Sequence, residues 1–204
     1  MPVDSNRRFL SRTIRVRAGF GLVELMVVIA IVAILAALAL PSYQQTIKNN
    51  RSATEANDLL TALDMARTEA VTRSRFASVC PSNTDASACG DPADWTKGWI
   101  VFLDDYNNVG TFEAATDKVV RAWPPNSALQ TGQDAITSTL SGAPVSSISF
   151  NRQGTPLVAG TALTAGTAVS FTVKPVSCPA GKQLVRTLTM PTLGRASVTT
   201  SACP

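Results

Sequence analysis

An apolar run from Phe20 to Leu40 most constrains this chain, because its 21 residues carry one charge, that of Glu24. As an α-helix rising 1.5 Å per residue it would be about 31 Å long, which matches the hydrocarbon core of a bilayer. Five arginines and one aspartate lie in residues 1–19. The positive-inside rule therefore predicts that this end stays in the cytoplasm and that the remainder of the chain lies outside.

Two kinds of segment fit such a run. A secretory signal peptide would be cut after Ala37-Leu38-Ala39 and its apolar part discarded. Signal peptides usually carry 7–15 apolar residues, however, and a carboxylate in mid-membrane costs about 2.5–3.5 kcal/mol. The length of the run and the presence of Glu24 favour a helix that is retained and in which the carboxylate has a role.

The residues that open the run, RAGFGLVEL from Arg17 to Leu25, resemble the type IV prepilin junction, and the match continues to Pro41. The resemblance implies that a prepilin peptidase cuts between Gly19 and Phe20 and methylates the new Phe20 amine. It also implies that Glu24 attracts the Phe20 amine of a neighbouring subunit during filament assembly. A carboxylate in the first helical turn complements the helix dipole as well. The alternative is a Glu24 that reaches the membrane interface without a partner.

Beyond Pro41 a helical pattern continues, because residues 42–75 contain neither glycine nor proline. One apolar stripe recurs at intervals of three and four residues, while Glu55 and Asp58 are among the charged residues expected on the other faces. We expect one helix over residues 20–75, bent or loosened at Pro41. Its second half should pack on a globular head through the stripe, which consists of Ala56, Leu59, Leu63, Ala66 and Ala70.

After residue 75 the sequence changes to short extended runs separated by Gly, Pro, Asn and Ser. One long helix followed by six or seven strands predicts an α+β protein with an antiparallel β-sheet or β-sandwich head. Residues 126–144 and 153–168 are expected to be loops. The expected strands are 76–80, 99–103, 118–123, 145–150, 169–173, 184–190 and a short piece near 197.

The patterns, together with the leader removal that the prepilin resemblance implies, divide the chain into four expected segments. Residues 1–19 form the leader that is removed, 20–41 the transmembrane and assembly helix, 42–75 the part of the helix that packs on the head, and 76–204 the periplasmic head. In that oxidising compartment four cysteines can form two disulfides with three connectivities. We favour Cys80–Cys89 and Cys178–Cys203, because each closes a local loop. The same spacings lack the paired Cys-x-x-Cys pattern of a zinc site.

Four blocks of the head resemble the GspH/FimT family of minor pseudopilins: ARTEA at 66–70, CPS at 80–82, WTKGWIVFLD at 95–104 and the Gly-Arg pair at 194–195. The resemblance implies a type IV pilin-like fold and a low-copy structural subunit, without enzymatic activity, that primes or caps assembly of a type IV pilus. The alternative is the corresponding pseudopilin H of the type II secretion system. Implied partners are major and minor pilins or pseudopilins, the prepilin peptidase and the inner membrane. The expected location is a single pass through that membrane, followed by incorporation near the filament tip.

A further alternative is a pilus-tip receptor that binds double-stranded DNA for natural transformation. Residues 135–204 contain five basic side chains and no acidic one, and phosphate neutralisation supplies most non-specific DNA affinity. Some FimT-type proteins bind DNA through Gly-Arg-x-Arg, whereas this chain has Ser197 where the second arginine would stand. The candidate DNA-binding residues are Arg152, Lys174, Lys182, Arg186 and Arg195.

No catalytic, cofactor or metal site is predicted. The chain contains no histidine, which excludes Ser-His-Asp and Cys-His catalysis. Asp104 and Asp105 are adjacent at a strand end and should point to opposite faces, so they do not suggest an acid/base pair. The loop that begins at Asp105 resembles a calcium-binding loop, but its fifth and twelfth positions are Val109 and Thr116. We therefore interpret it as a turn.

Overall fold

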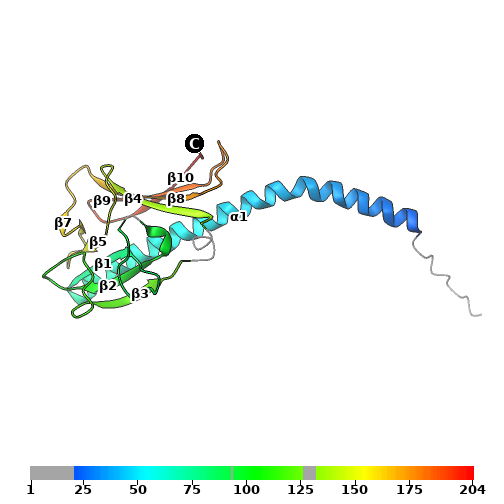
Figure 1. The fold of residues 1–204 in the computed structure, drawn as a ribbon. Coiled ribbons are helices and arrows are strands. Elements are labelled where there is room, and N and C mark those ends of the chain that lie inside the picture. The colour runs from blue at the N-terminus through cyan, green and yellow to red at the C-terminus, as the bar shows by residue number, and fades with distance from the viewer. Residues whose placement is uncertain (1–20, 93, 126–131) are drawn as a thin grey trace, which may run out of the picture. The chain divides into compact units, whose positions relative to one another are not determined.

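The computed structural model describes residues 21–92, 94–125 and 132–204 (Figure 1). Its first element is helix α1, Leu22–Arg73, whose 52 residues include Pro41 without a break in the helical assignment. The helix ends where Ser74 adopts φ +53°, which lets the amide of Arg75 donate to the carbonyl of Ala70 at 3.2 Å. The described residues divide into two units, one that ends at Tyr43 and one over Gln44–Pro204.

The second unit contains two antiparallel sheets, so the predicted α+β fold class is confirmed. The six-stranded sheet has the order β3-β2-β1-β5-β6-β7, and the four-stranded sheet has the order β10-β9-β8-β4. A 3₁₀ turn, η1 (Trp95–Lys97), precedes β2. The strands are β1 (Phe76–Pro81), β2 (Trp99–Asp104), β3 (Lys118–Trp123), β4 (Asp134–Leu140), β5 (Ile148–Phe150), β6 (Pro156–Val158), β7 (Thr161–Ala162), β8 (Ala168–Pro175), β9 (Val185–Pro191) and β10 (Ser197–Ser201).

Both sheets and the second half of α1 contribute to one hydrophobic core. The predicted stripe of α1 is buried throughout, and the four-stranded sheet contributes residues such as Phe171 and Leu188. Trp95 anchors η1 in this core by donating its indole N–H to the carbonyl of Val145 at 3.1 Å. The stripe therefore forms core rather than a binding surface.

Strand β2 is buried on both faces, as its continuous apolar sequence predicts. Trp99, Val101 and Leu103 face the main core. Ile100 and Phe102 face a smaller cluster on the other side of the sheet. Phe112, from the loop after β2, packs its ring edge-to-face on that of Phe102, with centroids 5.2 Å apart.

The prediction that residues 126–144 and 153–168 are loops is wrong in part, because β4, β6 and β7 lie there. Strand β4 has few apolar residues, and its buried positions include Asp134 and Ser138 as well as Ile136. Tertiary partners satisfy these polar groups: the Ser138 hydroxyl donates to the carbonyl of Val145 at 3.1 Å. A buried face made largely of polar residues leaves no apolar alternation to detect.

Candidate functional site

The first part of α1 carries large apolar side chains that are exposed all round the helix. Between Leu22 and Leu38 these side chains are 47–74% exposed. In the described part of the chain, α1 is the one helix long and apolar enough to cross a membrane. Such a surface calls for lipid or other apolar helices to cover it.

Glu24 lies in the first turn of α1, where its carboxylate complements the partial positive charge of the helix start. Gly19 and Phe20, the predicted cleavage and methylation positions, lie outside the described residues. The role of Glu24 as partner of a neighbouring amine therefore stays a prediction.

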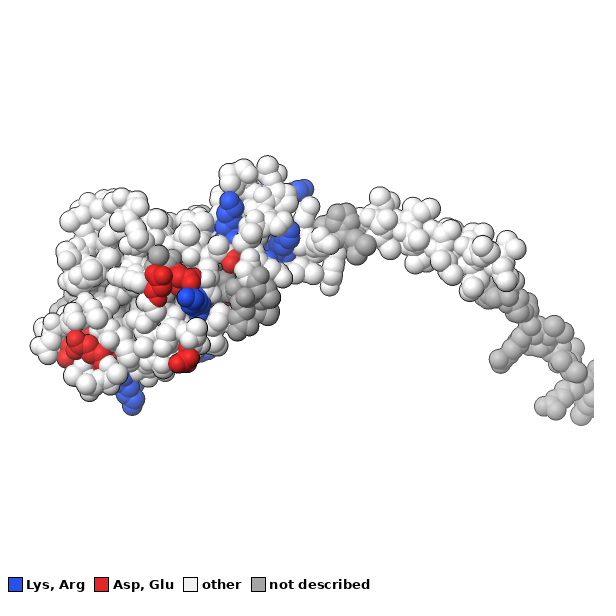
Figure 2. Space-filling model, viewed as in Figure 1, with Lys and Arg blue, Asp and Glu red and all other residues white. Residues whose placement is uncertain are grey.

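The five candidate DNA-binding residues fall into two groups. Arg186 is the second residue of β9 and pairs with Val173 of β8, which Lys174 follows. Lys182 lies in the connection between these strands. Arg152 lies in the connection that follows β5 of the six-stranded sheet, and Arg195 lies in the connection that follows β9 of the four-stranded sheet. Figure 2 likewise shows charged residues in small separate groups on a largely uncharged face.

Two of these cations already have intramolecular partners. Arg186 donates to Asn49 Oδ1 on α1 at 2.5 Å and to the Thr200 hydroxyl. Arg152 donates to the Tyr106 hydroxyl at 2.7 Å and lies over its ring. A continuous phosphate-binding surface would need cations that share one face and are free to bind. The five residues do not form one cluster, and double-stranded DNA as a partner stays a prediction.

Two of the four sequence blocks meet in the structure. Arg67 from the first block donates its guanidinium N–H to the carbonyl of Gly194 at 3.3 Å. Gly194 has φ +71°, and a Cβ there would lie 3.0 Å from the carbonyl oxygen of Gly154. Gly154 in turn lies against the side chain of Arg67. The Gly194-Arg195 pair therefore forms a tight turn against α1, so its glycine has a structural role that does not involve DNA.

Sequence reasoning missed a buried charged group between α1 and β4. Glu55, expected on an exposed face, is 2% exposed, and its Oε1 has no hydrogen-bond partner. Burial chiefly, and then repulsion from Asp134 and Asp58, raises the pKa of Glu55 to about 7. Arg51 pairs with the buried carboxylate of Asp134 through two guanidinium N–H groups. Nothing in the local sequence identifies this group, because α1 and β4 are far apart in the chain.

The prediction that the side chains of Asp104 and Asp105 point to opposite faces is wrong. One carboxylate oxygen from each of them and one from Asp117 all lie within 4.8 Å of one another. Asp105 has already left the strand, and the loop returns Asp117 to the same place at the start of β3. The comparison with a calcium-binding loop covered twelve positions, from Asp105 to Thr116. It therefore did not include Asp117, the next residue.

The cysteines form two disulfides, Cys80–Cys89 and Cys178–Cys203. These are the local pairings that the sequence favours. The first ties β1 to the loop that follows it, and the second ties the β8–β9 connection to the residues after β10.

Comparison with known families gives two matches along the chain. The profile described as type II transport protein GspH matches residues 55–194. The profile described as prokaryotic N-terminal methylation motif matches residues 14–40. Together they include the membrane-length segment and most of the head.

Comparison with individual proteins gives shorter or more distant likeness. The type IV major alpha-pilin and the fimbrial protein Q of Moraxella bovis are each 47% identical over 57 residues, or 26% of this chain. The chain spans about a third of the length of these curated relatives, 36% in each case.

Two solved structures are similar to the chain in outline. The type IV minor pilin FimU of Pseudomonas aeruginosa has 22% identity and a TM-score of 0.49, over 74% of this chain and 89% of that one. The minor pseudopilin EpsH of Vibrio cholerae has 10% identity and a TM-score of 0.40, over 76% of this chain and 96% of that one.

Proposed function

The chain belongs to the family of the type II transport protein GspH, and from this membership we propose that it is a minor pilin that primes or caps assembly of a type IV pilus. It is a structural subunit in this proposal and has no catalytic role. Before assembly it is anchored in the inner membrane by the first part of α1, with its amino terminus in the cytoplasm and its head in the periplasm. Its partners are other major and minor pilins.

The observation that carries the proposal is the exposed apolar surface of α1 between Leu22 and Leu38, with Glu24 in its first turn. An all-round apolar helix is stable either in lipid or among similar helices, so one segment serves both the membrane-bound and the assembled state. In low dielectric a lone carboxylate is costly without a partner, and the Phe20 amine of a neighbouring subunit would supply one. Glu24 would then select the correct axial register during assembly.

Removal of the leader is tested by mass spectrometry of the protein purified from its native membrane. We expect a mature chain that begins at Phe20 with a methylated amine, as the methylation motif over residues 14–40 suggests. An intact residue 1–19 extension, or a chain that begins just after Ala39, would contradict the proposal.

The role of Glu24 in assembly is tested in a strain from which the gene is deleted. The strain receives one of three genes, which encode the wild type, the Glu24→Ala variant or the Glu69→Ala variant. The Glu69 variant is the matched control, because it removes a carboxylate from the same helix where it pairs with Arg73 at the surface. We expect Glu24→Ala to insert in the membrane and fold its head, yet fail to enter sheared filaments. Equal incorporation of the two variants would show that Glu24 has no role in assembly.

The alternative, pseudopilin H of a type II secretion system, predicts a different phenotype for the same deletion strain. Loss of surface pili and twitching with normal protein export would support the pilus assignment. Loss of exported enzymes with normal pili would overturn it in favour of secretion.

A further inference from the structure

The loop between β2 and β3 brings three carboxylates together. Asp104 is the last residue of β2, Asp105 follows it, and Asp117 directly precedes β3. Each offers an oxygen, and the three oxygens lie within 4.8 Å of one another. Two oxygens bound to the same Ca²⁺ at 2.3–2.6 Å can be about 5 Å apart at most. Oxygens this close to one another can serve as ligands of the same calcium ion.

The side chain of Asp104 supplies an independent observation. It is 1% exposed, and its Oδ2 accepts hydrogen bonds from the Ser78 hydroxyl at 2.5 Å and from the Gly110 amide at 2.6 Å. Its Oδ1 is buried and has no hydrogen-bond partner. Leaving a buried carboxylate oxygen without a donor or a cation is costly, because water no longer solvates it. A cation bound to this oxygen would offset that cost.

The negative charge of the cluster is not balanced by protein cations. None of the ion pairs in the described ranges involves Asp104, Asp105 or Asp117. Three carboxylates grouped in this small volume are an arrangement that a divalent cation stabilises.

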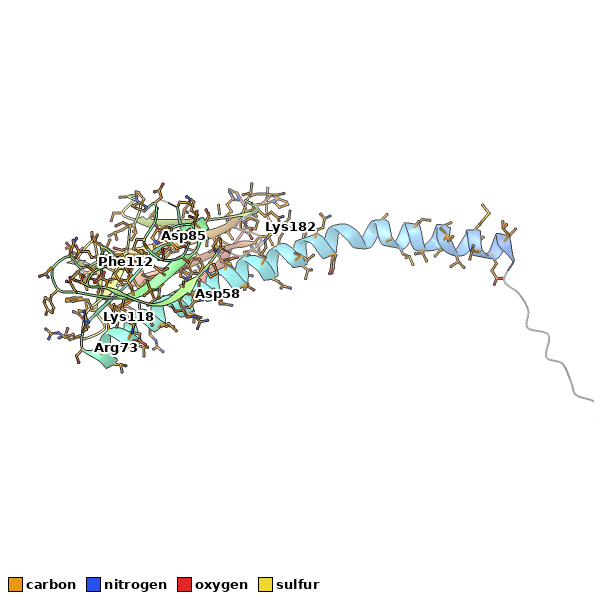
Figure 3. All side chains as sticks on the ribbon, turned by 60° about the horizontal axis from the view of Figure 1, so that its bottom comes forward. Asp58, Arg73, Asp85, Phe112, Lys118 and Lys182 are labelled. Carbon is orange, nitrogen blue, oxygen red and sulfur yellow. A yellow bond between two sulfur atoms is a disulfide. The ribbon has the colours of Figure 1, made fainter. Side chains whose placement is uncertain are left out.

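The loop is also held in shape before any ion arrives. Asp117 accepts the amide N–H of Asp105 at Oδ1, 3.1 Å away, and that of Glu113 at Oδ2, 2.7 Å away. Phe112 fixes the middle of the loop on the sheet through its contact with Phe102. Figure 3 labels Phe112 in this loop and Lys118 at the start of the strand that follows. Binding would therefore require little ordering of the chain.

We propose that Asp104, Asp105 and Asp117 bind one calcium ion, which holds the β2–β3 loop against the six-stranded sheet. The ligand set consists of oxygens, which suits a hard cation; the chain has no histidine, and all four cysteines are in disulfides. Mg²⁺ requires near-octahedral geometry at 2.0–2.1 Å and usually keeps several waters, whereas Ca²⁺ accepts an irregular set of carboxylates. Asp105 and Asp117 are half-buried, so water can reach the ion on their side and complete its coordination. The site lies in the head and goes beyond the role in assembly.

The proposal is tested with the full chain in detergent micelles, freed of divalent ions with EDTA. Thermal unfolding and calorimetric titration are measured with CaCl₂ and separately with MgCl₂, at constant ionic strength. We expect a dissociation constant for Ca²⁺ of about 10⁻⁴–10⁻³ M, the range of extracellular calcium modules, and a rise in melting temperature of several degrees at 10 mM. MgCl₂ should cause a much smaller rise.

Three variants separate a specific site from a general salt effect. Asp117→Asn should weaken calcium binding at least tenfold, and Asp104→Asn should abolish the calcium-dependent rise while raising the melting temperature of the metal-free protein. Asp85→Asn, which removes an exposed carboxylate outside the cluster, should respond as the wild type does. The proposal is overturned if 10 mM CaCl₂ leaves the melting temperature unchanged, if all three variants respond equally, or if MgCl₂ acts as strongly as CaCl₂.

Discussion

The buried carboxylate of Glu55 allows the effect of one substitution to be worked out in advance. Its pKa is raised from 4.5 to about 7, mainly by burial and then by Asp134. One pKa unit corresponds to 1.36 kcal/mol, so the difference of roughly 2.5 units amounts to about 3 kcal/mol. Because the folded state holds this proton more tightly than the unfolded state, the stabilisation is complete below pH 4.5 and is lost as the pH rises through about 7.

Glu55→Gln removes the titration and keeps the shape of the side chain. We expect the variant to exceed the wild type in free energy of unfolding by up to about 3 kcal/mol at pH 8, and to match it at pH 4. Urea unfolding of the full chain in micelles, followed by the fluorescence of the buried Trp95 and Trp99, measures this difference across the pH range.

The matched control is Glu69→Gln, the same change on the same helix at a surface ion pair with Arg73. A pair of this kind is worth about 0.3–0.5 kcal/mol, so this variant should differ little from the wild type at any pH. If the stability difference between Glu55→Gln and the wild type did not change between pH 4 and pH 8, the argument from burial would be refuted.

Three further substitutions test other parts of the head by the same unfolding measurement. Arg51→Ala leaves the buried carboxylate of Asp134 without its cation and should lower the free energy of unfolding by about 3–5 kcal/mol. A loss below about 1 kcal/mol would mean that water reaches this carboxylate. Replacing Cys178 and Cys203 together by serine opens a loop with a sequence separation of 25. By the chain-entropy model this should lower the free energy of unfolding by about 3 kcal/mol. Reducing agent should then destabilise this variant less than it destabilises the wild type. Gly194→Ala places a side chain at φ +71° and 3.0 Å from a backbone carbonyl oxygen, so it should destabilise the head by about 1–3 kcal/mol, and an unchanged stability would contradict the tight turn.

Local patterns predicted the elements whose residues interact with near neighbours in the chain. The stripe from Ala56 to Ala70 repeats with helical period, and its burial follows from that period. The apolar sequence of β2 likewise predicts burial on both faces, as observed. Each of these inferences depends on a pattern of neighbouring residues, which can be read from the sequence before the fold is known.

The same reasoning failed where a residue meets its partner from a distant segment. The composition of residues 126–144, rich in Gly, Ser, Thr and Ala, favours a loop, whereas the structure has strand β4 there. Its Asp134 is buried against a cation from α1, Arg51. Glu55 was expected on an exposed face, because helical period alone does not identify which edge of the stripe β4 covers. The distribution of the cations also depends on the fold, since Arg186 lies near the start of β9 and Arg195 follows its end.

The sequence by itself determined that this chain has a membrane-length helix with one acid near its start, a packed second half and a head of short strands. These features depend on hydrophobicity and periodicity, which are summed over neighbouring residues. Only the tertiary structure decided that Glu55 and Asp134 are buried together and that Asp117 joins Asp104. Those groupings depend on strand register and on loop closure, because carboxylates far apart in the chain interact strongly only when folding places them within a few ångströms and removes the water between them.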